Sequence, residues 1–306
     1  MNNLSISALV LAAILAWPVS AQDYQKGLAA AQAGDYATTL IEWMPLAEAG
    51  DRNIQLSIGI IFAEGLGVDQ NYPEAAKWYR MSAEQGMPQA AFNLGVFYDF
   101  GHGVEQDHSE SAKWYLLSAE QGFTNARRNI ALAYQNGRGV SQDYERAIVW
   151  FRLAAKQGDI GSMINLDVLH SLGVTNSIEI SEATEWLQLA ADLGSDLAQS
   201  KLGLRYINGQ GVDQDNVEGM KYILKAAENG FVNAQHNLGS LYRTGTGVMR
   251  NRVMALMWYN VATDNGQKNS KVWIDRLGEK MTPADISKAQ AMARECMNSG
   301  YKKCGY

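Results

Sequence analysis

A Ser-x-x-Lys motif near the C-terminus is the first pattern that could do chemistry. The chain holds one such motif, Ser299-Gly300-Tyr301-Lys302, and Arg243-Thr244-Gly245 looks like the Lys-Thr-Gly element of serine acyl-enzymes. That chemistry needs a nucleophile, a base and oxyanion donors that converge on one carbonyl group. Ser299 lies in a terminal tail, the chain has no Ser-Asp-Asn, and Gly245 belongs to a repeated loop. We therefore predict no catalytic residues.

Metal and nucleotide sites find equally little support. The four histidines, His102, His108, His170 and His236, share no ligand spacing with one another or with acidic residues. Asp213-Gln214-Asp215 begins like a calcium loop, but Val217 and the missing terminal Glu end the match. The recurring Gly-x-Gly loops lack the third glycine of a dinucleotide site. We predict no metal and no cofactor.

Composition narrows the class of protein. The 306 residues carry 26 Lys and Arg against 32 Asp and Glu, for a net charge of −6. Such a chain lacks the excess of cations with which proteins neutralise phosphates, so we expect no nucleic-acid partner. Hydrophobic residues make up 47% and charged residues 19%, which allows a packed core and argues against global disorder.

The N-terminus has the pattern of a secretory signal peptide. An apolar run from Ala8 to Trp17 is followed by Pro18, and Val19-Ser20-Ala21 places small residues at the −3 and −1 positions. We predict a signal peptide over residues 1–21, cleaved after Ala21. The run is shorter than the ~20 residues that cross a bilayer. No Lys or Arg precedes it, which leaves a buried helix as the alternative. We expect a mature protein in the periplasm or secreted, with no transmembrane segment.

The predicted export affects how the two cysteines of the chain, Cys296 and Cys304, are interpreted. A close, isolated pair in an exported protein favours a disulfide over a redox centre. Closing so short a loop should stabilise the fold by about 2–3 kcal/mol. We predict that Cys296 and Cys304 are bonded.

The remainder of the chain is a repeat with a period of 36 residues. Gly65-Leu66-Gly67-Val68 recurs at Gly101, Gly137, Gly209 and Gly245, with one altered copy at Gly173. A second glycine series and an aromatic series keep the same period: Gly50, Gly86, Gly122, Gly158, Gly194, Gly230 and Gly266; Trp78, Trp114, Trp150, Trp186, Tyr222 and Trp258. A fixed period of this length is typical of a solenoid.

Each copy is predicted to form two helices. In the second copy, Ala90, Leu94 and Tyr98 fall on one face of a helix that ends at Gly101. Asp107 is placed to cap the next helix, which ends at Gly122. The same column, meaning positions 36 residues apart, holds Asn71, Asp143, Asp215 and Asn251. The predicted fold class is all-α, a right-handed α/α solenoid of stacked antiparallel helix pairs.

These motifs resemble the Sel1-like repeat family of tetratricopeptide-type solenoids. The resemblance rests on Ala90-x-x-x-Leu94-Gly95-x-x-Tyr98, the Gly-x-Gly-Val loop, and Ala112-x-Trp114-Tyr115. It implies six repeats over residues 54–269, with capping helices at 22–53 and 270–306. It further implies an adaptor or assembly scaffold, often in the bacterial envelope or at host contact. Some cysteine-rich relatives are connected with penicillin binding or β-lactam hydrolysis.

The fourth copy departs from the pattern. Gly173-Val174-Thr175-Asn176 replaces Gly-x-Gly-Val, Asp167 stands in the column of Gly95, and His170 stands in the column of Tyr98. Two interpretations remain open: a local change of loop path and curvature, or a functional notch around Asp167 and His170.

Variable columns of the first helices supply candidate binding residues, because fixed columns serve the stack. One variable column holds Gln55, Ala91, Arg127, Met163, Gln199 and Gln235. From the variable positions and the basic C-terminal end we predict a concave binding face of Leu56, Phe92, Asp99, Phe100, Arg128, Arg205, His236 and Arg243. Aromatic and arginine side chains dominate interface energetics. The alternative for Phe92 and Phe100 is that they cover the gap between adjacent repeats.

Together these patterns predict an exported, non-enzymatic adaptor that binds a protein or peptide partner. We expect it to act as a monomer in cell-envelope assembly or host contact. The alternative is a small-ligand binding protein or hydrolase that acts on cell-wall material or β-lactams.

Overall fold

The structure is a computed structural model that describes residues 21–305. In this range the chain forms sixteen α-helices and one short 3₁₀ helix, without strands. The described residues divide into two compact units on either side of the boundary between Asp159 and Ile160. The predicted signal peptide falls, apart from Ala21, outside the described residues and stays a prediction.

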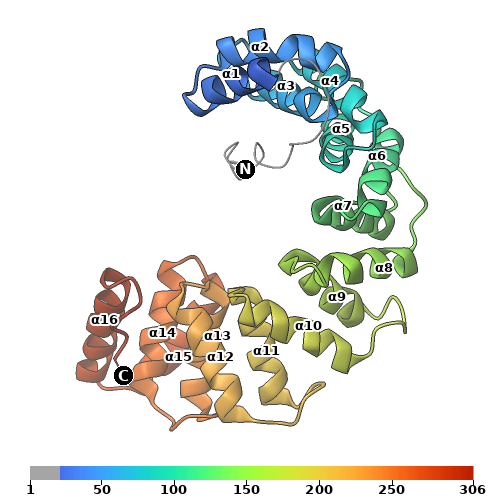
Figure 1. Cartoon of the computed structure of the whole chain (residues 1–306). Helices are drawn as coiled ribbons and strands as arrows, with labels where there is room; N and C mark the ends of the chain where they lie inside the picture. Colours follow the sequence, from blue (N-terminus) through green and yellow to red (C-terminus); the bar gives the residue numbers. More distant parts are fainter. Residues whose placement is uncertain (1–20, 306) are drawn as a thin grey trace. The chain divides into compact units, whose positions relative to one another are not determined.

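The first unit holds eight helices in which consecutive helices pack against each other (Figure 1). They are α1 (Ala21–Gln32), α2 (Tyr36–Glu48), α3 (Arg52–Glu64), α4 (Tyr72–Glu84), α5 (Pro88–Phe100), α6 (His108–Glu120), α7 (Thr124–Asn136) and α8 (Tyr144–Ala155). Helix α3 pairs with α4, α5 with α6, and α7 with α8. Buried alanines and leucines such as Ala90 and Leu94 face the neighbouring helices, as the apolar periodicity predicts.

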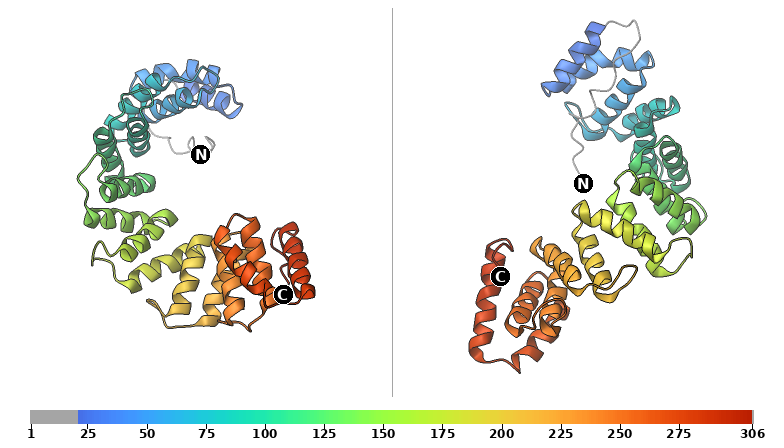
Figure 2. Two further views of the ribbon diagram at one scale, coloured as in Figure 1. Left: turned by 180° about the vertical axis from the view of Figure 1, so that it is seen from behind. Right: turned by 60° about the horizontal axis from the view of Figure 1, so that its bottom comes forward.

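The second unit continues the same arrangement. Its helices are α9 (Ile160–Leu172), α10 (Ile180–Asp192), α11 (Asp196–Asn208), α12 (Asn216–Glu228), α13 (Val232–Thr244), α14 (Arg252–Asp264), η2 (Lys268–Ser270), α15 (Lys271–Gly278) and α16 (Pro283–Asn298). Helix α16 packs against α14 and lies at the C-terminal end of this unit (Figure 2). The two units together confirm the predicted all-α solenoid of helix pairs.

The second helix of most repeats begins at the predicted cap. Asp107 Oδ1 accepts hydrogen bonds from the backbone N–H groups of Ser109, at 2.8 Å, and Glu110, at 3.1 Å. The other members of this column do the same for α4, α8, α12 and α14: Asn71, Asp143, Asp215 and Asn251. The cap satisfies donors that the first turn of a helix leaves unpaired. The predicted helix starts are confirmed.

The second glycine of each Gly-x-Gly loop lies against the preceding repeat. A Cβ added to Gly103 would lie 2.3 Å from the carbonyl carbon of Tyr72, and one added to Gly139 would lie 1.9 Å from the carbonyl oxygen of His108. Tyr72 and His108 are the first residues of α4 and α6. Gly67, Gly211 and Gly247 approach the starts of α2, α10 and α12 in the same way. We call this the loop contact.

The disulfide forms as predicted. Cys296 at the end of α16 is bonded to Cys304, with their Cα atoms 4.4 Å apart. Both cysteines are buried in the core that α16 shares with α14, together with Ala289 and Ala293. The bridge therefore ties the C-terminal tail back onto the helix that covers α14.

Reducing this bridge should loosen the C-terminal end of the second unit. We expect a Cys296→Ser/Cys304→Ser variant to lose about 2–3 kcal/mol of unfolding free energy, because its unfolded chain is no longer constrained. Urea unfolding of both proteins, with and without reductant, measures the difference. Reductant should shift the wild-type midpoint and leave that of the variant in place; equal midpoints for oxidised wild type and variant would contradict the expectation.

Candidate protein-binding site

Two of the eight predicted binding residues lie in the interior. Leu56 is 5% exposed and Arg205 is 7% exposed. The position of Arg205 corresponds to those of Leu169 and Leu241, one repeat before and one after, which are also buried. Both side chains face the core, so neither Leu56 nor Arg205 presents a side chain to a partner.

The variable column that begins at Gln55 is also a core column. Gln55 and Gln235 are fully buried, and their side-chain amides donate to the carbonyl oxygens of Ala47, at 2.9 Å, and Ala227, at 3.3 Å. These carbonyls lie at the ends of the preceding helices, where the helix leaves its own acceptors unpaired. The polar members of this column bond to helix ends, and Ala91 and Met163 are buried in the core, so the expectation that the column is free for recognition is wrong.

Arg205 and Asp167 form a buried ion pair in the fourth and fifth copies. Asp167, 1% exposed, accepts hydrogen bonds from Arg205 and, at 2.7 Å, from Lys201 Nζ. Arg205 also donates to the hydroxyl of Thr184 and, at 3.0 Å, to the carbonyl oxygen of Ile180. Burial lowers the pKa of Arg205, and the negative charge of Asp167 opposes that shift. This cluster joins α9, α10 and α11 and serves the stack.

His170 supports the altered loop of the fourth copy. Its Nδ1 lies 2.9 Å from the carbonyl oxygen of Ile178, within the segment between α9 and α10. Asp167 is buried and ion-paired, and His170 contacts its own loop. These contacts support the interpretation as a local change of loop path over that of a functional notch.

Phe92 and Phe100 differ in their surroundings. Phe92 is half-buried and packs against Tyr115 and Phe123, with ring centroids 5.8 Å and 5.1 Å away. It therefore covers the gap between α5 and the following helices. Phe100 is 59% exposed, and its ring stacks on that of His102. Phe100 offers an apolar face to solvent. Every member of its column is exposed, although the side chains differ in chemistry: Glu64, Phe100, Asn136, Leu172, Asn208 and Thr244.

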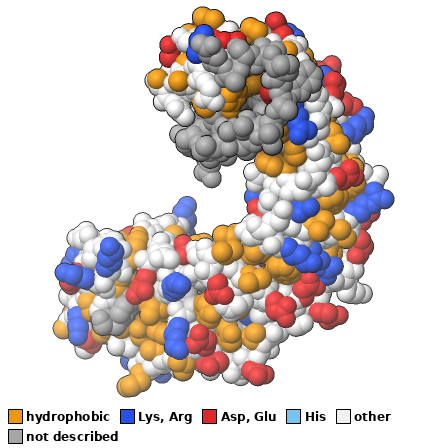
Figure 3. All heavy atoms as spheres, viewed as in Figure 1, with side chains coloured by type: hydrophobic (Ala, Val, Ile, Leu, Met, Phe, Trp, Pro, Cys, Tyr) orange, Lys and Arg blue, Asp and Glu red, His pale blue; other side chains and the backbone are white. Residues whose placement is uncertain are grey.

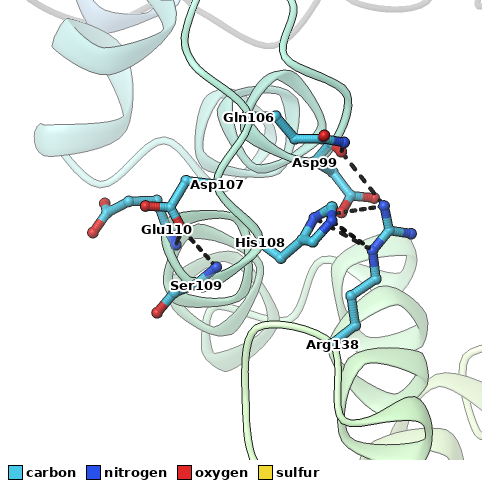
Figure 4. Close-up of polar contacts among 7 residues, drawn as sticks. All are labelled: Asp99, Gln106, Asp107, His108, Ser109, Glu110 and Arg138. Atoms are coloured by element: carbon cyan, nitrogen blue, oxygen red, sulfur yellow. Dashed lines mark hydrogen bonds and ion pairs between the residues drawn. The ribbon is translucent and has the colours of Figure 1, made fainter.

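At Asp99, the residue before Phe100 in α5, polar side chains from two consecutive copies converge (Figure 4). Asp99 Oδ1 lies 3.1 Å from His108 Nδ1 and 3.3 Å from Arg138 Nη2. The carboxylate of Asp99 is largely buried, whereas Arg138 is about half exposed. Asp99 thus holds the guanidinium group of Arg138 at the surface. Phe100 follows Asp99 in α5 and stacks on His102. We call Asp99, Phe100, His102, His108 and Arg138 the Phe100 surface.

The sequence reasoning missed His108 and Arg138. Arg138 is the residue between the two glycines of its loop, and His108 is the first residue of α6 in the preceding copy. The loop contact of Gly139 brings them together. One copy earlier, the equivalent residues are His102 and Tyr72, whose rings stack with centroids 4.9 Å apart. The signal was present in the periodicity: residue x of a loop meets a residue 30 positions earlier.

The other predicted residues also have partners within the chain. Arg128 Nη1 lies 2.6 Å from Asp159 Oδ1, so this cation is neutralised. His236 Nδ1 lies 2.8 Å from the hydroxyl of Ser270. Burial, and secondly the positive charge of Arg243, lower the pKa of His236, which favours its neutral form. Arg243 lies half-exposed over the ring of Trp273.

The hydroxyl groups of the Ser-x-x-Lys and Thr-Gly motifs complete helix ends. Ser299 Oγ donates to the carbonyl oxygen of Cys296 and accepts from the backbone N–H groups of Lys302 and Lys303. Thr244 Oγ1 donates to the carbonyl oxygen of Ser240. Within residues 21–305 no group of three or more His, Cys, Asp and Glu side chains is placed to hold a metal ion. Over the same residues no helix is both long and apolar enough to cross a bilayer.

Comparison with known proteins identifies the repeat. The Sel1 repeat family matches six segments, residues 55–87, 88–123, 124–159, 169–195, 196–231 and 232–267. The chain belongs to the Sel1 repeat family. The fourth match begins only at residue 169, after Asp167, in the copy whose first helix carries the buried ion pair.

Solved structures of Sel1 repeat proteins share the fold. A Sel1 repeat protein from Oxalobacter formigenes is 27% identical, with a TM-score of 0.64 over 79% of this chain and 97% of that chain. A protective antigen of uropathogenic Escherichia coli with this fold is 27% identical, with a TM-score of 0.59 over 91% of this chain and 70% of that chain. Among curated proteins no match was found.

Proposed function

We propose that this Sel1 repeat protein is an exported, non-enzymatic adaptor that binds a protein or peptide partner on the face formed by its first helices. The observation that carries the proposal is the Phe100 surface. Phe100 presents a large apolar ring that is 59% exposed, and Asp99, the residue before it in α5, holds Arg138 in an ion pair. Aromatic and arginine side chains are enriched among the residues that contribute most to protein interfaces.

The difference between the buried and the exposed columns of the repeat supports the proposal. Buried columns keep glycine, alanine and leucine, and tertiary packing accounts for them. Exposed columns vary from copy to copy, so recognition can differ along the array without cost to the stack. Of the predicted residues, Asp99, Phe100 and Arg128 remain candidate contacts in the first unit, and His236 and Arg243 in the second. The proposal excludes Leu56 and Arg205, which are buried, and Phe92, which packs between helices.

Export rests on three observations. The N-terminal pattern predicts a signal peptide, and the buried Cys296–Cys304 disulfide suits an oxidising compartment. The similar protein from uropathogenic Escherichia coli is described as a protective antigen, which fits an exported protein. A role in cell-envelope assembly or host contact is part of the proposal. The alternative in cell-wall or β-lactam chemistry is not favoured, because the hydroxyls of Ser299 and Thr244 are engaged with their own helix ends.

Crosslinking in the producing cell, followed by mass spectrometry, tests the adaptor. We expect wild type to capture one protein, and a Phe100→Ala/Arg138→Ala variant to capture it at least about tenfold less, because hot-spot truncation costs 2 kcal/mol or more. Val149→Ala is the matched control: its side chain is 53% exposed, on α8 of the same unit.

The control variant should capture as much partner as wild type. Equal capture by wild type and Phe100→Ala/Arg138→Ala, with unchanged helicity, would overturn the Phe100 surface as the binding site. Turnover of a β-lactam reporter or of cell-wall fragments by the purified protein would overturn the non-enzymatic assignment.

A further inference from the structure

The C-terminal end of the chain is basic, although the whole chain is acidic. Residues 243–306 hold 11 Lys and Arg against 5 Asp and Glu, whereas the full chain holds 26 against 32. All these cations except Arg243 are exposed: Arg250, Arg252, Lys268, Lys271, Arg276, Lys280, Lys288, Arg294, Lys302 and Lys303. Lys and Arg side chains stand out over these helices in Figure 3. The cations therefore gather on α13–α16 and the tail after α16.

Among residues 21–305, these cations form no ion pair with a carboxylate. The ion pairs of Lys and Arg side chains with carboxylates involve cations earlier in the chain, such as Lys26, Arg128, Arg205 and Lys221. By contrast, exposed lysines of the earlier repeats, such as Lys77 and Lys113, pair with a glutamate three residues before them. A surface with so many unpaired cations favours an anionic ligand.

Two of the arginines are ordered by an aromatic ring. The guanidinium groups of Arg243 and Arg276 lie 4.1 Å and 5.0 Å from the ring centroid of Trp273. Arg243 Nε also donates to the hydroxyl of Tyr259 at 3.3 Å, and the Tyr259 ring stacks on that of Trp273. The ring contacts limit the motion of both guanidinium groups, so less conformational entropy is lost when they bind. We call Arg243, Trp273 and Arg276 the Arg–Trp–Arg cluster.

We propose that the Arg–Trp–Arg cluster docks an acidic segment of the partner protein, with an Asp or Glu carboxylate held by Arg243 and Arg276. This inference rests on the proposed adaptor function and specifies the chemistry of its partner. Guanidinium groups bind carboxylates through paired hydrogen bonds, which a lysine cannot reproduce. Val272, which precedes Trp273 in α15, is 52% exposed and is available for an apolar contact with the segment. The surrounding lysines attract further acidic residues.

The observations favour a protein segment over an anionic lipid surface. A lipid surface attracts Lys and Arg alike through charge. Arginines fixed on a tryptophan, as here, are typical of specific protein recognition. The two cases make different predictions for a substitution that keeps the charge and removes the planar guanidinium group.

Fluorescence anisotropy with a short fluorescein-labelled peptide rich in Glu and Asp tests the inference. We expect the peptide to bind wild type, and its Gln and Asn counterpart to bind at least about tenfold more weakly, since charged hydrogen bonds contribute more than neutral ones. Arg243→Lys/Arg276→Lys should weaken binding about tenfold through loss of the paired hydrogen bonds. The matched control, Arg250→Lys/Arg294→Lys, changes two exposed arginines outside the cluster and should leave the affinity within about twofold of wild type.

Results other than these would contradict the binding of an acidic segment by the Arg–Trp–Arg cluster. Equal loss in both double variants, or loss in neither, would show that binding is diffuse attraction by the basic surface. Binding to phosphatidylglycerol vesicles that depends on Arg243 and Arg276, without binding of the peptide, would assign the cluster to lipid. Thermal unfolding followed by circular dichroism excludes misfolding of the charge-conserving variants. Partner capture through the Phe100 surface with no peptide binding would remove this inference alone; peptide binding with no captured protein would remove the adaptor proposal.

Discussion

Replacing Asp167 with alanine is expected to destabilise the second unit by about 3–5 kcal/mol, the cost of leaving a buried charge without its partner. The carboxylate of Asp167 is buried between Arg205 and Lys201, and the Arg205 side chain is itself only 9% exposed. Alanine at position 167 would leave the guanidinium group of Arg205 in the core with neutral partners alone. Urea unfolding measures the loss, and hydrogen exchange of α9–α11 locates it.

A second substitution should restore most of this stability. In Asp167→Ala/Arg205→Leu the charge is removed together with its partner, and buried ion pairs can often be replaced by packed apolar groups at little cost. Leucine is the residue at the equivalent positions 169 and 241. As a control, Lys221→Ala breaks an exposed pair with Glu218 and should leave stability unchanged. If the double variant is no more stable than Asp167→Ala, the pairing of the two charges is not what stabilises this region.

Replacing Gly139 with alanine should have an effect of similar size in the first unit. Gly139 has φ of 74°, which costs a residue with a Cβ about 1–2 kcal/mol. The new Cβ would also lie 1.9 Å from the carbonyl oxygen of His108, so the loop must move, at a further cost of about 1–3 kcal/mol. We expect a total loss of about 2–5 kcal/mol in urea unfolding.

Gly158→Ala separates the two contributions. Gly158 has φ of 89° and lies in the same unit, but an added Cβ would meet no atom within 4 Å. This variant should lose only the conformational part, about 1–2 kcal/mol. Equal losses for the two variants would mean that the loop contact contributes nothing. Because Arg138 precedes Gly139, the Gly139 variant should in addition capture less partner in the crosslinking experiment.

The local features of the fold could be predicted from sequence because their physical causes are local. A helix start needs an acceptor for its free N–H groups, and Asp107 supplies it within three residues. A helix that ends on a residue in the left-handed conformation favours glycine there, and Gly101 has φ of 73° at the end of α5. Five of the six copies have both features, so the interpretation of each copy supports that of the others.

The binding face could be predicted only in part, because exposure depends on how each helix is rotated against its neighbours. Gln55 and Glu64 both stand in variable columns, yet one is fully buried and the other is exposed. Variation alone does not separate a helix-capping amide from a surface side chain. Arg205 was interpreted as a surface cation for the same reason. Its partner Asp167 lies 38 residues earlier, and only the packing of α9 against the following helices brings the two charges together.

The loop contact has a consequence for how such proteins diversify. Each exposed pair at the loops, such as His108 with Arg138, draws one member from each of two neighbouring copies. Duplication or deletion of a whole 36-residue unit therefore creates a new combination of side chains at the seam while each unit keeps its own core. Recombination between copies can thus change the side chains that meet at the loops in a single step, without point substitutions.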